Sequence, residues 1–440
     1  MSHVRLSGWG RYPRAECELV AAWTADDVVR EIAGRSRLIA RGAGRAYGDA
    51  ALNPDATLDM GRLNRLLSFD GETGLLACQA GERLGDILGV FGPRGWFPPV
   101  TPGTRHVTVG GMIAADVHGK NHHGEGSFGA HLEWIDLAGA DGGIVRCSPA
   151  ERTDLFEATI GGMGLTGVIL AAAFRLKPIE TGLIRQKLAR ADNLDHALHV
   201  FESEARWTYS VAWIDCMAKG ARLGRSLVYL GEHASRAEAP GGGRPYRARS
   251  PRLAAPFDLP GFTLNGLSIR AFNALYAALP RPAEGFVEAD PYFYPLDAVA
   301  DWNRIYGGRG FVQHQCVLPL HVGRDGLVEI LGRVSAHGSG AFLAVLKRFG
   351  PAGRGLMSFP MEGYTLAMDF PADADHFRLL DALDAAVVAH GGRLYLAKDA
   401  RQSAATLAAG YPRLTEFAAA RERSGANGRF DSLLSRRLGL

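Results

Sequence analysis

VTPGTRHVTVGGMIAADVHGKNHHGEGSFGAH, residues 100–131, is the stretch of the chain that decides its fold. A turn, a β-branched run at 107–109, a Gly-Gly pair and the polar cluster HGKNHH follow one another in it without a spacer. Glycines directly after a strand let the backbone approach a ligand closely and turn its N–H groups into a concave anion site. We therefore expect a strand that ends near residue 109, followed by a loop that binds phosphate.

Titratable side chains follow this loop, namely His118, Lys120, His122 and His123. Imidazole and ammonium groups just beyond a phosphate site suit the reactive end of a nucleotide cofactor. The three histidines are also potential metal ligands, but they lie in a glycine-rich loop without an acidic or thiol ligand cluster, so we expect no metal site. The stretch is interpreted as the floor of a nucleotide-cofactor site.

Two further glycine clusters indicate the same kind of site. RGAGRAYGD, 41–49, follows a short strand expected at 37–40, and the cluster Gly161, Gly162, Gly164 and Gly167 precedes a long apolar strand. One domain wrapped around an extended cofactor explains three such clusters better than unrelated loops do. The other elements expected here are a helix over 20–34 with Thr24 as N-cap, a β-β-α unit (58–66, 74–80, 83–90) and a hairpin of 135–138 with 144–146.

Length and composition indicate a globular protein of two domains. Of 440 residues, 47% are hydrophobic, 22% are charged and 56 are glycine. The net charge is only +3, and no basic stripe with interleaved aromatics occurs, which argues against nucleic acid as a partner. Five cysteines lie far apart without a CxxC pair, which favours a reducing compartment.

The N-terminal thirty residues lack the apolar core of a secretory signal, and no stretch reaches the length of a membrane span. We expect a cytoplasmic protein, with peripheral contact to a membrane left open. Beyond about residue 178 aromatic residues become frequent and glycine motifs sparse, which predicts a domain boundary. The Gly-, Pro- and Arg-rich segment 239–256 is expected to be a solvated loop, although its arginines would also suit phosphate. The segment 267–279 is apolar at helical spacing, typical of a core or lid helix.

Two later stretches carry candidate ligand-binding side chains. A strand expected over 312–318 brings Gln313 and Gln315 to one face, either toward solvent or as a hydrogen-bonding wall for a hydroxylated ligand. In GGRLYLAKDAR, 391–401, period two puts apolar residues and Lys398 on one strand face. Lys398 is then either a snorkelling side chain at a strand end or, beside a ligand, a catalytic one.

RGAGRAYGD, VTPGTRHVTVGGMIAADVHGKNHH with the following SFG, and GGRLYLAKDAR together resemble the vanillyl-alcohol-oxidase (PCMH) type of FAD flavoproteins. The resemblance is closest to the decaprenylphosphoryl-β-D-ribose 2′-oxidase group and covers nearly the whole chain, with HGKNHH and LAKD as its specific part. It implies an α+β fold with an FAD-binding domain over 1–178 and a substrate-binding domain on a large antiparallel sheet over 179–395. A C-terminal segment, 396–440, would return to the FAD domain.

The resemblance also implies the roles of particular residues. Contacts to FAD are expected from Arg41, Gly42, Ala43, Gly44, Arg45, Ala46, Tyr47, Pro102, Gly103, Thr104, Val107, Gly110, Gly111, His118, Gly119, Gly162, Gly167, Val168, Ile169 and Tyr395. Contacts to the substrate are expected from Tyr47, His118, Lys120, Gln313, Gln315, Lys347, Thr365 and Lys398. The expected catalytic residues are Lys398, His118 and Tyr395, and Lys398 matches the family's active-site lysine.

These residue types suit the oxidation of a secondary alcohol. Its carbon must lie against flavin N5, and a cation such as Lys398 would stabilise the reduced ring, while His118 or a water accepts the hydroxyl proton. Arg45 stands where relatives that tether FAD covalently have histidine, so we expect non-covalent FAD. Thr365 and Ala367 stand where the family has an Asn-x-Cys stretch, which bears on substrate preference.

Three functions agree with this sequence. The leading hypothesis is oxidation of the 2′-hydroxyl of a polyprenylphosphoryl-β-D-ribose to a ketone, the first half of an epimerisation in cell-wall polysaccharide biosynthesis that an NAD(P)H-dependent short-chain reductase completes. The second is oxidation of a free polyol, aldonolactone or natural-product sugar, and the third is a non-catalytic flavin-binding scaffold. Lys120 and Lys347 favour a phosphorylated substrate, whereas Thr365 and Ala367 favour divergence from the family.

Overall fold

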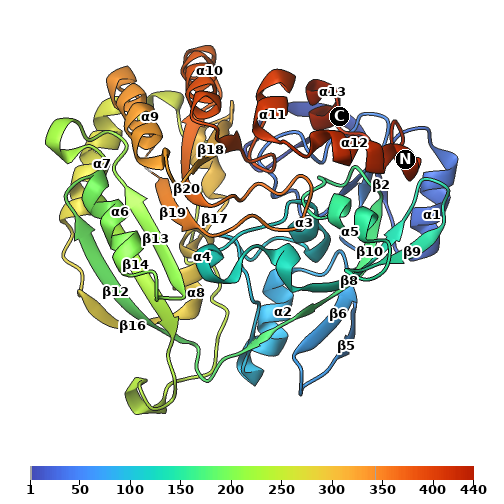
Figure 1. Ribbon diagram of the computed structural model, residues 1–440, viewed down its shortest axis with the longest axis horizontal. Helices are drawn as coiled ribbons and strands as arrows, with labels where there is room; N and C mark the ends of the chain where they lie inside the picture. The colour runs from blue at the N-terminus through green and yellow to red at the C-terminus, as the bar shows by residue number, and fades with distance from the viewer. Residues whose placement is uncertain (1, 342) are drawn as a thin grey trace.

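The computed structural model describes residues 2–341 and 343–440 and places them in three main β-sheets and surrounding helices. Figure 1 shows the large sheet on the left, the two smaller sheets on the right, and the last helices of the chain above the smaller sheets. The expected α+β fold with a large antiparallel sheet is confirmed. All three sheets contribute residues to the wall of a single long cavity.

The first sheet leads into the loop that follows residue 41. It consists, in order, of β1 (Ser2–Ser7), β2 (Arg14–Ala21), β4 (Thr57–Asp59) and β3 (Ile39–Arg41). Strand β1 is antiparallel to β2, and β4 is parallel to both β2 and β3. Helix α1 (Ala25–Gly34) begins at the expected cap, because the Thr24 hydroxyl accepts a hydrogen bond from Asp27 N and the Asp27 carboxylate accepts one from Thr24 N.

The second sheet is antiparallel and carries the other two glycine clusters. It consists, in order, of β5 (Leu66–Phe69), β6 (Leu75–Gln79), β10 (Val168–Arg175), β8 (Leu132–Ala138) and β9 (Ile144–Cys147). Its helices are α2 (Leu84–Phe91), α3 (Val109–Ala114), α4 (His122–Glu125) and α5 (Thr153–Thr159). The hairpin of β8 and β9 and the long apolar strand β10 are confirmed. A short pair, β7 (Trp96–Phe97) with β11 (Lys177–Pro178), follows.

The large sheet has eight antiparallel strands. They are, in order, β16 (Glu284–Glu288), β12 (Leu183–Ala191), β14 (Ser226–His233), β13 (Tyr209–Ile214), β19 (Ala344–Phe349), β20 (Gly363–Pro371), β18 (Phe311–Pro319) and β21 (Arg393–Leu394). The helices of this part are α6 (Leu194–Ser203), α7 (Gly266–Ala278), α8 (Ala289–Phe293), α9 (Gly323–His337) and α10 (Ala374–Ala389). A parallel pair joins β15 (Leu253–Ala254) to β17 (Val299–Ala300).

The two faces of the large sheet have different neighbours. Leu366 and Met368 of β20 point into a core that contains residues of α6, α9 and α10. Thr365 and Ala367 alternate with them and line the cavity on the opposite face. The period of two in these strands therefore separates a packed face from a ligand-facing one.

The C-terminal residues pack against the first sheet. Helices α11 (Ala404–Gly410), α12 (Leu414–Arg423) and α13 (Leu433–Leu438) lie near the N-terminus in Figure 1. Leu38 N donates to Arg429 O over 3.0 Å, and the Asn53 amide donates to Asp431 O over 2.7 Å. The chain after Lys398 is thus tied to the first sheet, and the chain before it is tied to the large sheet by the pairing of β21 with β18.

The expected strand at 107–109 is wrong. The Thr108 hydroxyl accepts a hydrogen bond from Gly111 N over 3.2 Å, so Thr108 is the N-cap of helix α3 and the Gly-Gly pair lies in its first turn. A capping threonine outweighs the strand preference of two flanking valines. The glycines still line the cavity, but as the start of a helix.

Two strands are shorter than expected. The stretch 58–66 is not one strand, because β4 ends where the Asp59 carboxylate accepts a hydrogen bond from Gly61 N and starts a turn. Strand β21 ends at Leu394, and Lys398 N donates to Tyr395 O over 2.9 Å in a turn. Lys398 therefore reaches the cavity from a turn and not by strand alternation.

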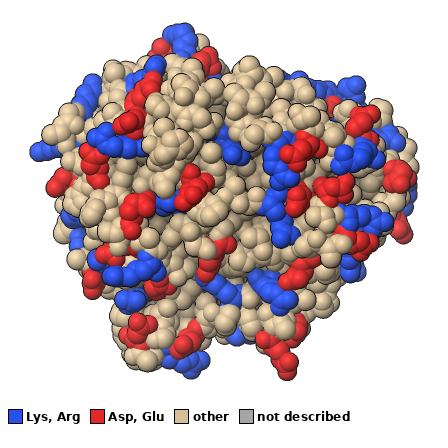
Figure 2. All heavy atoms as spheres, in the orientation of Figure 1, with Lys and Arg blue, Asp and Glu red and all other residues tan. Residues whose placement is uncertain are grey.

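Several whole-chain features accompany this fold. All five cysteines are unpaired and buried. None of the helices in the described part of the chain combines the length and apolar character needed to cross a bilayer. Figure 2 shows basic and acidic side chains interspersed over the face that it draws, without a continuous basic stripe. Short 3₁₀ turns lie at Gly92–Arg94, Phe128–His131, Gly220–Arg222, Pro240–Gly242, Gly261–Thr263, Pro295–Ala298 and Trp302–Tyr306.

Candidate active site

A cavity of about 750 Å³ lies between the glycine-rich loops and the ligand-facing side of the large sheet. Its size is within the range of cavities that hold cofactors and substrates. Of the residues expected to bind FAD or substrate, all line this cavity except Gly162 and Val168. Val168 is fully buried in a core beside the first sheet, and a side chain on Gly162 would meet the Ala158 carbonyl. Met163 and Gly164 take their place in the wall.

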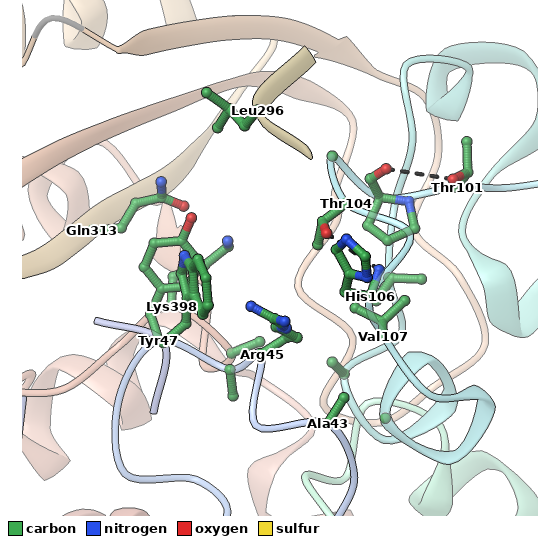
Figure 3. A pocket seen from close by; sticks show the side chains of 18 of the residues that line it. Ala43, Arg45, Tyr47, Thr101, Thr104, His106, Val107, Leu296, Gln313 and Lys398 are labelled. Atoms are coloured by element: carbon green, nitrogen blue, oxygen red, sulfur yellow. Dashed lines mark hydrogen bonds between the residues drawn. The ribbon is translucent and has the colours of Figure 1, made fainter. Parts of the chain in front are cut away.

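The end of β3 and the loop after it each contain one arginine, and that of the loop, Arg45, has a buried nitrogen without a hydrogen-bond acceptor in the described part of the chain. The Arg41 guanidinium donates to Ser7 O and Ala51 O, so it fixes the loop. The Arg45 guanidinium lies over the Trp9 ring at 4.1 Å, and its buried Nε has no hydrogen-bond partner among the described residues. Figure 3 shows Arg45 in the middle of the cavity. An anion in the cavity would supply the missing acceptor.

Close backbone packing shapes the same wall. A side chain on Gly42 would lie 2.1 Å from Thr108 Oγ1, so the first glycine loop rests directly on the start of α3. Gly44, with φ of +63°, turns the chain back beneath the Arg41 side chain. Figure 3 places Thr104, His106 and Val107 on the side of the cavity opposite Tyr47 and Lys398. The glycine loops thus form a narrow trough with space for a ligand of extended shape.

The other end of the cavity gathers basic side chains around a buried histidine. His118 Nδ1 lies 3.5 Å from Lys347 Nζ, and His118 Nε2 lies 3.0 Å from the amide nitrogen of Gln315. The register of β19 and β20 sets Lys347 opposite Thr365. Lys398 Nζ lies over the Tyr47 ring at 3.5 Å, and Figure 3 shows both beside Gln313. Gln313 and Gln315 therefore form a wall of the cavity and do not face solvent.

Lys120 joins this group from the loop after α3. Its ammonium group donates to Tyr292 O and lies 4.1 Å from the Tyr292 ring centroid. Tyr395 is held beside His118 by a stacked contact with Phe359, at 4.6 Å, and by a hydrogen bond from its hydroxyl to Ala115 O. The Tyr395 hydroxyl is thus committed to the backbone.

Burial and mutual repulsion shift the proton affinities of this group. Burial, with the charges of Lys347, His122 and Lys398, holds the pKa of His118 well below its usual range, so the ring is neutral at pH 7. Burial and the charge of Lys347 lower the pKa of Lys120 to about 7, and burial lowers that of Lys347 to about 8. For Lys398, burial lowers the pKa to about 7, although the Asp369 carboxylate opposes this shift.

Asp369 is the carboxylate that acts on Lys398, whereas Asp297 and Asp301 line the cavity itself. The Asp369 carboxylate accepts hydrogen bonds from the Gln313 amide at 2.5 Å and from the Tyr306 hydroxyl at 3.2 Å. Burial raises its pKa to about 6, while the bond from Gln313 and the charge of Lys398 limit the rise. Sequence reasoning missed this residue, because nothing in GYTLAMDFP distinguishes an active-site carboxylate from a surface one.

The histidines of HGKNHH diverge in space. His118 lies in the cavity, whereas the His122 ring packs on Phe349 at 4.5 Å and its Nδ1 accepts from Gly350 N. His123 Nε2 lies 2.9 Å from Trp207 O. Across residues 2–341 and 343–440, no three His, Cys, Asp or Glu side chains come together as metal ligands would.

A second group of wall residues was also missed. The segment DPYFYPLD, 290–297, supplies Tyr292, Phe293 and Leu296, and Trp302 follows. Figure 3 shows Leu296 at the rim of the cavity, above Gln313. The dense aromatic run was the available signal, but only the fold shows that it faces the ligand space.

The comparisons with known proteins show the family to which this chain belongs. The family model described as "FAD binding domain" matches residues 18–148. The decaprenylphosphoryl-beta-D-ribose oxidase of Mycolicibacterium smegmatis is 37% identical over 99% of this chain and 97% of its own. The chain belongs to the FAD-binding oxidoreductases of the vanillyl-alcohol-oxidase (PCMH) type.

Two further comparisons agree with this assignment. An uncharacterized protein in the mprA 5′ region of Streptomyces coelicolor is 39% identical over 79% of this chain and 97% of its own. The solved structure of Physcomitrella patens BBE-like 1 superposes with a TM-score of 0.66 at 16% identity, over 94% of this chain and 89% of that one, which shows a shared fold. As a member of this family the protein is an FAD-dependent oxidoreductase acting on CH–OH groups.

The residues of the cavity fit FAD. The orphaned Nε of Arg45 lacks an acceptor that a phosphate oxygen would provide, and the trough at Gly42 has no room for a side chain. The 750 Å³ space extends from these loops to His118 and Lys398. The glycine loops would therefore hold the phosphates, with the reactive ring toward the lysine end.

Proposed function

We propose that this enzyme oxidises the 2′-hydroxyl of a polyprenylphosphoryl-β-D-ribose to a ketone. The observation that carries the proposal is the convergence of Lys120, Lys347 and Lys398 on one end of the cavity. In the described part of the chain, no carboxylate pairs with Lys120 or Lys347, whereas Asp369 lies within electrostatic range of Lys398. Cations withdrawn from water need an anionic partner, which a phosphodiester supplies. The Mycolicibacterium relative is named for such a substrate.

The roles of the chain's own residues follow from their positions. FAD, when bound, takes up the hydride from the alcohol carbon. The hydroxyl proton passes to His118 or to a water beside it, and direct transfer to His118 requires that Gln315 or Lys347 give up its contact with a ring nitrogen. Lys398, when protonated, stabilises the negative charge that develops beside it.

The sugar and the phosphate would occupy different parts of this end. Gln313, Gln315 and Tyr47 offer amide and hydroxyl groups to the sugar, while Lys120 and Lys347 hold the phosphate as point charges. The ketone product is reactive and needs a hydride donor for its conversion to the epimeric alcohol. We therefore include an NAD(P)H-dependent short-chain reductase as the partner that consumes it.

Anaerobic titration tests the proposal. Farnesylphosphoryl-β-D-ribofuranose is added to the purified yellow protein, and the flavin band at about 450 nm, which reports hydride transfer to the cofactor, is followed. Bleaching by this substrate, without bleaching by ribose or free alditols, supports the proposal. Bleaching by free polyols alone contradicts it and favours the second candidate below.

A specific observation supports that second candidate, the oxidation of a free polyol, aldonolactone or natural-product sugar. The Thr365 hydroxyl donates to Cys316 O at 2.8 Å and accepts from Gln315 at 3.3 Å, so it is already satisfied. Ala367 beside it offers no polar group. This wall is therefore less polar than an Asn-x-Cys stretch would make it, which suits a different sugar.

Replacing Lys120 or Lys347 with methionine tests the phosphate site. We expect each variant to raise the KM for the phosphoryl ribose by about tenfold or more, because a charged hydrogen bond or ion pair is lost. The maximal rate of flavin reduction at saturation should change much less in the Lys120 variant, since Lys120 is not assigned to the chemistry, whereas the Lys347 variant also removes a charge next to His118. A fall in rate without a change in KM would remove these residues from substrate binding.

Acid precipitation tests the binding mode of FAD. Arg45 occupies the loop position at which relatives that tether FAD covalently have histidine. Among the described residues that line the cavity, none is a cysteine. We therefore expect all yellow colour in the supernatant after precipitation. If colour stays in the pellet, His106→Ala is the control, because His106 and His118 are the two histidines among the described residues that line the cavity.

A further inference from the structure

Helix α7 presents an apolar face to solvent. Its sequence, GLSIRAFNALYAA, contains one charged residue, Arg270. Leu267 is 78% exposed and Leu275 63%, whereas Ile269 and Asn273 are the buried residues of the helix. Of the two expectations for 267–279, a core helix is wrong, because the helix packs along one side and leaves its leucines uncovered, whereas a lid helix stays a prediction.

Exposed apolar side chains continue on the segment before α7. Leu253 is 69% exposed and Phe257 58%. This segment is anchored, because Tyr246 is buried and its hydroxyl donates to Asp290 Oδ1 over 2.7 Å. The sequence predicts a solvated loop over 239–256. Its outward side chains are solvated, but Tyr246 anchors the segment to the protein. We refer to the exposed residues Leu253, Phe257, Leu267, Phe272, Leu275 and Leu279 as the α7 surface.

The charge around the α7 surface is one-sided. Between residues 244 and 281 the chain has six arginines and one acidic residue, Asp258. Asp258 is neutralised by ion pairs with Arg11 and Arg304. Apart from Arg249, which pairs with Glu288, the arginines of this stretch form no ion pair within the described residues. The stretch therefore carries an excess of positive charge, although Glu284 and Glu288 follow it in the chain and Arg244 and Arg252 lie within electrostatic range of Glu288.

The α7 surface is continuous with the cavity. Tyr276 of α7 lines the cavity, and so does Pro251, which is itself exposed. The Arg281 guanidinium covers the Tyr276 ring at 4.3 Å. Because residues of the same two segments form both the cavity wall and the exposed apolar surface, a chain that leaves the cavity here would reach the α7 surface first.

We propose that the α7 surface docks on an anionic lipid bilayer, with the leucines of α7 in the interface and the arginines at the headgroups. Large apolar side chains on a nearly uncharged helix face, bordered by arginine, are the pattern of an interfacial helix. Docking would hold the cavity entrance at the membrane, where a polyprenyl chain resides. The last point rests on the proposed function; the docking itself does not.

Vesicle sedimentation tests the proposal with the intact FAD-loaded protein. Vesicles of phosphatidylcholine and phosphatidylglycerol are compared with vesicles of phosphatidylcholine alone. We expect the wild-type protein to sediment with the anionic vesicles, and Leu267→Gln/Leu275→Gln to lower the partition coefficient by about tenfold or more, since two leucines no longer enter the interface. Arg247→Gln/Arg252→Gln should lower binding to anionic vesicles and weaken its salt dependence.

Matched controls separate the possible outcomes. Leu67→Gln/Ile144→Gln removes two apolar residues of the second sheet that are about half exposed, and this variant should bind like the wild type. The proposal is overturned if the wild-type protein does not bind anionic vesicles, or if the leucine variants bind them as well as the wild type does. It is also overturned if the wild-type protein is a dimer in solution and the leucine variants are monomers. In all variants the flavin band should bleach to the same extent when a short-chain phosphoryl ribose is added in micelles. Failure of that bleaching in wild type would refute the proposed function while leaving the docking result intact.

Discussion

Lys398→Met should slow flavin reduction by substrate about a thousandfold while the protein keeps its FAD. Lys398 lies in the cavity wall next to Tyr47 of the loop after β3: Tyr47 N donates to Ala397 O over 2.9 Å, and the Lys398 ammonium group lies over the Tyr47 ring at 3.5 Å. In the proposed mechanism its charge acts beside the reacting alcohol, so its removal should affect the rate more than the binding of FAD. Stopped-flow bleaching measures the rate, and the ratio of flavin to protein absorbance measures retention of FAD.

The pH profile gives a second readout of the same residue. Burial lowers the Lys398 pKa to about 7, and the protonated form is the active one, so the rate should fall as pH rises through about 7. Lys398→Arg keeps the positive charge, and its guanidinium does not titrate in this range. The rate of this variant should therefore not fall as the pH rises through about 7. Lys187→Met, at a surface lysine that pairs with Glu204, is the control. An unchanged rate in Lys398→Met would exclude Lys398 from the chemistry.

The parts of the site that the sequence predicts are those governed by local rules. The capped start of α1 follows from Thr24 and Asp27, three residues apart. Alternation in β18 predicts that Gln313 and Gln315 share a face, and the structure shows both in the cavity wall. The glycine clusters predict close approach of the backbone to a ligand, and Gly42, Gly44, Gly110 and Gly111 all line the cavity, while the contact with a ligand stays a prediction.

What the sequence does not show depends on contacts across the chain. Local pattern puts Lys398 on a strand, whereas a turn at Tyr395 delivers it to the cavity. Asp369 becomes an active-site carboxylate only because β20 lies between β18 and β19. The uncovered face of α7 has the same periodic pattern as a core helix, since periodicity reports an apolar face but not what covers it.

Gly42→Ala should weaken FAD binding by about ten- to a hundredfold, because a methyl group at this position would lie 2.1 Å from Thr108 Oγ1. The loop after β3 would have to move off the start of α3, which breaks the trough between the two glycine clusters. Flavin content after gel filtration and titration of the apoprotein with FAD measure the effect.

The contact partner supplies the decisive control. Thr108→Ala alone should cost about 1 kcal/mol of stability through the lost cap of α3 and keep FAD. Combined with Gly42→Ala it should restore part of the affinity, because the clashing hydroxyl is gone, so the two changes should not be additive. Gly89→Ala, in the exposed middle of α2 with no atom near the added methyl, should instead stabilise the protein by about 0.5–1 kcal/mol. Full FAD affinity in Gly42→Ala would show that the loop after β3 does not hold the cofactor.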